Sequence, residues 1–202
     1  MRTTVVLLGL ALAGLGPSPA RADTGAVDAV AFGRCLVEQD RGAALTLFAT
    51  LPPTDAAADL TRNAGCAGGP TSASTMAVRG GIAEALYKRD FREWGLPPRR
   101  ASTDLARLDL PGRADAGGSL FALGHCVARW QPNDLDRLFA TPPGSAREGR
   151  IIDRLAERFA PCQPAGTSVA IKRTHVRALL AQTAYELSRQ NAQGTLGETE
   201  AK

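Results

Sequence analysis

Carboxylates are the residues of this chain that could do acid–base chemistry. Glu84 and Glu186 lie in two similar segments, and glycoside hydrolysis needs two carboxylates held at a defined separation. When the two segments are aligned, however, Glu84 matches Gln182 and Glu186 matches Lys88. Neither acid recurs, although one carboxylate from each segment could still meet across an interface. A hydrolase of cell-wall or glycan material that uses Glu84 or Glu186 is therefore the alternative hypothesis.

Other catalytic patterns fail. The chain has only two histidines, His125 and His175, and neither is repeated. A packed or surface histidine is the simpler interpretation than a catalytic base. The sequence also lacks a nucleophile elbow, a Walker loop, a dinucleotide-binding glycine pattern and a His-Glu-x-x-His motif. We therefore name no catalytic residue, no metal ligand and no cofactor.

Two polar residue types do recur at a fixed spacing. Arg79 precedes Tyr87, and Arg177 precedes Tyr185, so that each pair lies on one side of a helix. In one interpretation these residues hold the fold: tyrosine buries its ring, and arginine bonds a carboxylate or a loop carbonyl. In the other they line a groove in which arginine meets a small anion. We favour the first, because a duplicated core retains the residues that hold it together.

A second basic feature is a stripe of four arginines at helical spacing. The stripe consists of Arg147, Arg150, Arg154 and Arg158. Asp153 and Glu157 lie within reach of it along the same helix. The stripe therefore predicts a solvated, salt-bridged face rather than an anion-binding surface.

The elements that position these residues form two similar blocks. Each block opens with a Gly-x-Cys, at Gly33 and Gly124, and continues to a Phe-Ala-Thr at Phe48 and Phe139. A second cysteine and a helix that contains the Arg/Tyr pair follow in both. We predict an all-α protein of two tandem repeated small helical units. The predicted boundaries are 23–96 and 117–190 for the units, 97–116 for a linker and 191–202 for a disordered tail.

Local signals predict where helices begin and how they cross. Asp40 is placed to cap a short second helix, and Pro132 suits the first turn of its counterpart. Ser145 begins a capping-box pattern, which predicts a helix through Phe159. The closing helices are predicted at about 75–91 and 172–188. A Gly80-Gly81 pair inside the first of them costs about 1 kcal/mol per glycine, which favours a close helix crossing at that point.

Four cysteines allow three pairings. The repeat favours Cys35–Cys66 and Cys126–Cys162, because each unit then carries the same link. There is no Cys-x-x-Cys, and zinc would need closely spaced ligand pairs. We therefore expect structural disulfides rather than redox or metal chemistry.

The N-terminal segment has the pattern of an export signal. An apolar run over 5–16 is too short to span a bilayer, and Ala20-Arg21-Ala22 suits cleavage before Asp23. We predict a signal peptide over 1–22, a periplasmic or secreted mature protein and no transmembrane segment after cleavage. Removal of Arg2 and Arg21 lowers the net charge from +4 to +2, so nucleic acid is not an expected partner.

Two stretches resemble a known group of proteins. The segments Phe32–Val37 and Val78–Tyr87, with Cys66 between them, are similar to small exported alphaproteobacterial proteins with a repeated cysteine-containing helical unit. The second copy departs from the closing motif at Ala178-Leu179-Leu180. The resemblance implies export and a repeated unit, and it implies no activity. Our leading hypothesis is a non-catalytic helical binding or envelope-associated protein, whose partner is an envelope component or a small anion and whose contact surface is the groove between the units.

Overall fold

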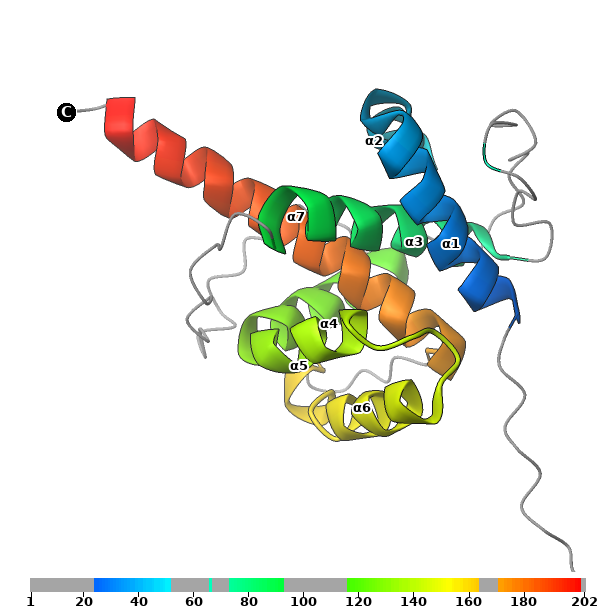
Figure 1. Ribbon diagram of the computed structural model, residues 1–202. Helices are drawn as coiled ribbons and strands as arrows, with labels where there is room; N and C mark the ends of the chain where they lie inside the picture. Colours follow the sequence, from blue (N-terminus) through cyan, green and yellow to red (C-terminus); the bar gives the residue numbers. More distant parts are fainter. Residues whose placement is uncertain (1–23, 52–65, 67–72, 93–115, 164–170, 201–202) are drawn as a thin grey trace, which may run out of the picture.

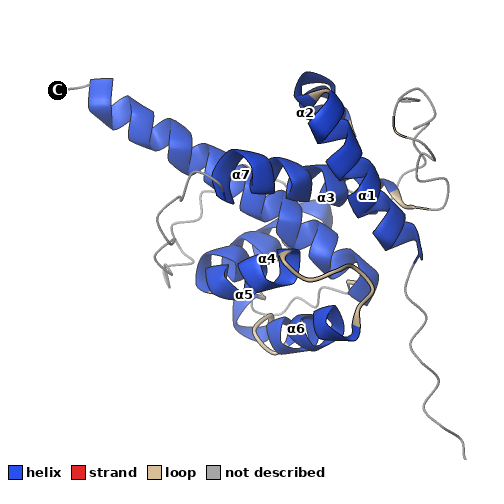
Figure 2. Cartoon of the chain, in the orientation of Figure 1, coloured by secondary structure: helices blue, strands red, loops and turns tan. Residues whose placement is uncertain are grey.

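The computed structural model describes residues 24–51, 66, 73–92, 116–163 and 171–200, and every regular element in these ranges is a helix (Figures 1 and 2). The elements are α1 (Thr24–Gln39), α2 (Arg41–Thr50), α3 (Thr75–Tyr87), the π-helical turn η1 (Lys88–Arg92), α4 (Ala116–Trp130), α5 (Pro132–Phe139), α6 (Ala146–Ala156), the 3-10 turn η3 (Ala160–Cys162) and α7 (Arg173–Glu200). The all-α prediction is confirmed. The predicted signal peptide and almost all of the predicted linker lie outside the described residues.

Three helices begin at the residues that the sequence predicts as helix starts. The Asp40 carboxylate accepts a hydrogen bond from the backbone N–H of Ala43 at 2.9 Å and caps α2. Pro132 is the first residue of α5, where its missing N–H costs nothing. The Ser145 hydroxyl accepts from the backbone N–H of Glu148 at 3.2 Å and caps α6.

Helices α3 and α7 lie against each other at the centre, with α1 and α2 on the α3 side and α4, α5 and α6 on the α7 side (Figure 1).

Glycines allow the backbones of neighbouring helices to approach closely. A Cβ atom on Gly81 would lie 2.1 Å from the Ala29 carbonyl oxygen, and one on Gly33 would lie 2.2 Å from the Gly81 carbonyl carbon. A Cβ atom on Gly80 would lie 2.4 Å from the Ala178 Cα. The close crossing predicted from the glycine pair is confirmed.

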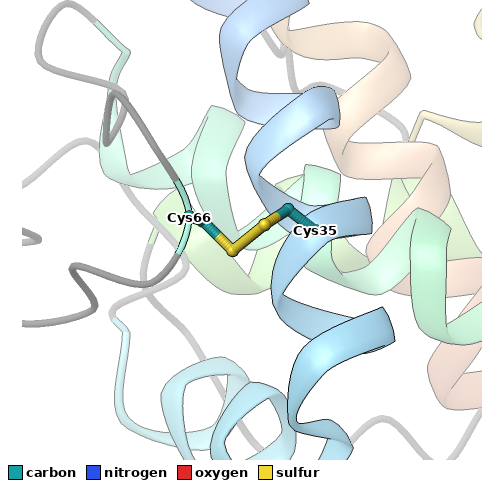
Figure 3. Close-up of a disulfide and its surroundings, with 2 residues drawn as sticks. All are labelled: Cys35 and Cys66. Carbon is teal, nitrogen blue, oxygen red and sulfur yellow. A yellow bond between two sulfur atoms is a disulfide. The ribbon is translucent and has the colours of Figure 1, made fainter.

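The described residues 24–92 and 116–200 each contain one disulfide. Cys35 of α1 is bonded to Cys66 (Figure 3), with a Cα–Cα distance of 5.8 Å. Cys126 of α4 is bonded to Cys162 of η3, with a Cα–Cα distance of 5.7 Å. The favoured pairing is therefore confirmed. Two such bonds fit a protein of the periplasm or the cell exterior, where thiols become oxidised. None of the described helices is both long enough and apolar enough to cross a membrane.

Two helix ends differ from the sequence prediction. Helix α7 continues to Glu200, through residues that were predicted to form a disordered tail. A helix already formed on α3 gains one hydrogen bond for each residue that it adds, and Gln, Ala and Glu are good helix formers. Helix α6 ends at Ala156 instead of Phe159, and the chain then turns into η3. This turn brings Cys162 back to α4.

Candidate binding groove between the two halves

We call the described residues 24–92 the first half and 116–200 the second half. Arg177 of α7 makes the most buried ion pairs between them. Its guanidinium donates to both Glu84 carboxylate oxygens, with its Nε 2.7 Å from Oε2 and its Nη2 2.8 Å from Oε1. Its Nη1 donates to Glu148 Oε1 at 2.8 Å and to the Thr141 carbonyl at 3.0 Å. The Arg177 and Glu84 side chains are only 6% and 1% exposed.

The charge of this network is nearly balanced. Lys88 Nζ also donates to Glu84 Oε1, at 2.6 Å, so both oxygens of the buried carboxylate face cations. Burial by itself would lower the pKa of Arg177, but the hydrogen bonds and charges of Glu84 and Glu148 outweigh it and raise that pKa. Arg177 is therefore a fixed cation with its donors in use.

Arg79 occupies the matching place in the first half. Its Nε donates to Gln182 Oε1 at 3.0 Å, and its Nη1 donates to the carbonyl oxygens of Phe48 and, at 2.7 Å, Leu51. Its Nη2 lies 3.3 Å from Glu186 Oε1, and its guanidinium carbon lies 4.1 Å from the centre of the Phe48 ring. Arg79 and Arg177 thus make the same two kinds of contact. Each bonds a backbone carbonyl near the end of a short helix in its own half, and each bonds a side chain on the closing helix of the other half.

The contacts across α3 and α7 are reciprocal. Arg79 donates to Gln182, and Arg177 donates to Glu84. Gln182 and Glu84 occupy matching positions when the two segments are aligned. The tyrosines behave in the same way: Tyr185 packs against Phe48 with ring centres 5.4 Å apart, and Tyr87 packs against Phe139 at 5.6 Å. Each aromatic ring thus contacts the opposite half. These contacts fit the interpretation in which the Arg/Tyr pairs hold the fold.

The remaining acid–base candidates are also bonded. Glu186 Oε2 lies 3.7 Å from His125 Nε2, and His125 is only 5% exposed. His175 Nε2 lies 3.3 Å from the Ser74 hydroxyl oxygen. Within the described ranges, no group of three or more His, Cys, Asp or Glu side chains is arranged to hold a metal ion.

A groove of about 810 Å³ lies between the two halves, lined by residues of α1 and α3 and by the chain that leads from α5 to α6. Its buried polar lining residues are Glu84, Arg177 and Thr141. The rest of the lining consists of Val30, Arg34, Val37, Glu38, Ala85, Lys88, Arg89, Phe139, Ala140, Pro142 and Pro143. Apolar walls thus alternate with charged groups, a composition typical of binding grooves.

The rim of the groove was not singled out from the sequence. Arg34 and Glu38 lie one turn apart on α1 and are both exposed. Val30 lies one turn before Arg34, half-buried, on the same side of the helix. The sequence does contain a signal for this rim: Val30, Arg34 and Glu38 follow one another at a spacing of four residues. A charged pair thus continues a helix face that begins with an apolar residue.

The two glutamates that were considered as catalytic residues are not brought together in this groove. Glu84 lines it, whereas Glu186 belongs to the separate contact set of Arg79. Because Arg177 and Lys88 bond both oxygens of Glu84, that carboxylate is held as an ion-pair partner and not as a free acid or base. Comparison of the chain with protein-family models, curated proteins and solved structures finds no significant match.

Proposed function

We propose that the protein is an exported, non-catalytic binding protein that takes an amphipathic anion into the groove between its two halves. The observation that carries this proposal is the groove itself: apolar walls surround a base in which every charged side chain is already bonded to another. Such a base can contact a ligand, while its carboxylate, Glu84, is held by Arg177 and Lys88 and is not free to act as a base.

The charge of the rim supports an anionic ligand. Arg34 and Arg89 are exposed, and Lys88 has a side chain that is 36% exposed. The opposing exposed acid is Glu38, since Glu84 is neutralised within the network. A carboxylate, sulfonate or phosphate on the ligand would therefore meet excess positive charge, while Val30, Val37 and the two prolines receive its apolar part.

Export is supported by two features. The sequence pattern of residues 1–22 is that of a signal peptide, and both cysteine pairs are oxidised. The resemblance to small exported alphaproteobacterial proteins agrees with it. Mass spectrometry of the protein recovered from the periplasm or the medium tests this part: a chain that begins at Asp23 is expected, and an uncleaved chain that is retained in the cytoplasm contradicts export.

An amphipathic dye tests the groove. 8-Anilinonaphthalene-1-sulfonate carries an apolar ring system and one sulfonate, and its fluorescence rises in apolar surroundings. We expect the native protein to bind it, and Arg34→Glu to lower the affinity by about tenfold, because repulsion replaces a charge-assisted hydrogen bond. Val30→Asp removes part of the apolar wall and has the same effect. Lys172→Glu is the matched control, since Lys172 is exposed and does not line the groove.

Two results would overturn the proposal. The first is dye binding that is absent, or that changes equally in Arg34→Glu and in the control. The second is hydrolysis of peptidoglycan or another glycan by the purified protein that disappears in Glu186→Gln. That substitution changes a partly exposed side chain and leaves the Arg177 network intact.

A further inference from the structure

The four-arginine stripe of the sequence lies in a different setting from the one predicted. Three of its members, Arg147, Arg150 and Arg154, surround a second hollow of about 490 Å³ together with Arg137 of α5 and Ile151. We call Arg137, Arg147, Arg150 and Arg154 the α5–α6 arginine cluster. The hollow is separate from the groove, with which it shares no lining residue.

Of the two acids that were expected to neutralise this stripe, Glu157 is exposed and Asp153 is bonded to another helix. Asp153 Oδ2 accepts from Arg173 of α7 at 2.9 Å. Glu148, a third acid of α6, accepts from Arg177 through its Oε1. The prediction of a salt-bridged stripe held together by neighbouring acids on α6 therefore does not describe these contacts.

One carboxylate serves the cluster. Asp134 Oδ1 lies 3.4 Å from Arg137 Nη1 and 3.9 Å from Arg154 Nη1, so a single oxygen is shared by two guanidinium groups. The Arg137 and Arg154 side chains are still 62% and 50% exposed. Arg147 and Arg150 are also exposed, and within the part of the chain that the structure describes neither has an ion-pair partner. The four cations and one acid leave a net charge of +3 around one hollow.

We propose that the α5–α6 arginine cluster binds phosphate groups. A guanidinium group presents paired N–H donors that match two phosphate oxygens, and several such groups around one hollow suit a ligand with two or more phosphate charges. The helices hold the arginines in place, because Ile151, Ile152 and Leu155 of α6 are buried on the side of the helix toward the core. The phosphates come either from a soluble phosphorylated molecule or from the headgroups of an anionic membrane.

The experiment measures both sources with the purified mature protein, which is expected to begin at Asp23. Isothermal titration with pyrophosphate tests soluble phosphate, and co-sedimentation with vesicles containing about 30% phosphatidylglycerol, against pure phosphatidylcholine, tests headgroups. Binding to pyrophosphate alone assigns a soluble ligand, and binding to the acidic vesicles alone assigns a membrane surface. Either binding weakens as salt is raised, since exposed charges are screened.

A double substitution, Arg147→Gln with Arg150→Gln, tests the residues. We expect the affinity for the bound probe to fall by about tenfold to thirtyfold, from the loss of two surface cations. Neither side chain is buried or paired, so the melting temperature should stay unchanged. Lys172→Gln with Arg189→Gln is the matched control: it removes the same charge at two exposed positions that line neither hollow, and it should leave binding intact. The proposal is overturned if neither probe binds at about 0.1 M salt, or if the control weakens binding as much as the double substitution does.

Discussion

The buried pair between Glu84 and Arg177 gives the sharpest test of how the two halves are held together. Glutamine is nearly the same shape as glutamate, so Glu84→Gln removes the charge and leaves the volume. Arg177 makes two hydrogen bonds to this carboxylate, at 2.7 and 2.8 Å. A bond to a charged group contributes about 1–1.5 kcal/mol more than a neutral one, so the substitution should cost about 2–3 kcal/mol of unfolding free energy.

The same substitution should behave differently once the arginine is gone. Arg177→Met leaves a carboxylate that is 1% exposed with Lys88 as its remaining cation, and it should cost about 3–5 kcal/mol. In that background Glu84→Gln removes a poorly compensated buried charge. Its cost should therefore fall to about zero, or the protein should become more stable.

Urea denaturation of the four proteins gives the coupling free energy. Asp90→Asn is the control, because Asp90 also bonds an arginine twice, through Arg41, at 3.0 and 2.7 Å. The Arg41 side chain is 42% exposed, so this substitution should cost less than about 1 kcal/mol. The reasoning is refuted if Glu84→Gln costs the same, within about 0.5 kcal/mol, with and without Arg177.

Three further predictions concern the disulfides, the helix crossing and alkaline stability. Replacing either cysteine pair by serine should lower the free energy of unfolding by about 4 kcal/mol, because the bonds close separations of 31 and 36 residues; an unchanged urea midpoint would contradict this. Gly81→Ala should cost about 1–3 kcal/mol despite its gain in helix propensity, since its Cβ would meet the Ala29 carbonyl. Gly42→Ala, whose Cβ would lie 3.3 Å from an exposed Asp40 carboxylate oxygen, should cost less than Gly81→Ala; thermal melts of both variants decide. Burial and the charge of Asp90 raise the pKa of Tyr185, so the fold favours the neutral phenol. The stability that this raised pKa contributes is present below pH about 10 and is lost as pH rises above that value. Tyr185→Phe should therefore flatten the fall in melting temperature above pH about 10, and curves that stay parallel would refute it.

Local features of the fold could be predicted from the sequence because they depend on neighbouring residues. Asp40 and Ser145 cap helices through backbone groups three positions away. The pairing of Cys35 with Cys66 followed from the order of landmarks along the chain. The Gly80-Gly81 pair indicated a close crossing because glycine inside a helix is otherwise unfavourable.

Contacts between helices could not be predicted in the same way, since they depend on how α3 and α7 cross. Alignment of Glu84 with Gln182 looked like the loss of a functional acid, yet both positions accept hydrogen bonds from the arginine of the opposite half. Asp153 was expected to pair along α6, but Arg173 of α7 lies close enough to compete for it. The groove likewise depends on where α1 lies relative to the segment between α5 and α6.

The groove exists only while the two halves stay docked and behave as one body across α3 and α7. Native-state hydrogen exchange, followed by mass spectrometry, measures this directly. The buried backbone amides of α3 and α7 should exchange with the same opening free energy, equal to that of global unfolding, and Arg177→Met should lower both together. Exchange in which α3 opens well below the global value while α7 stays protected would show that the two halves separate, and would contradict a groove held between docked halves.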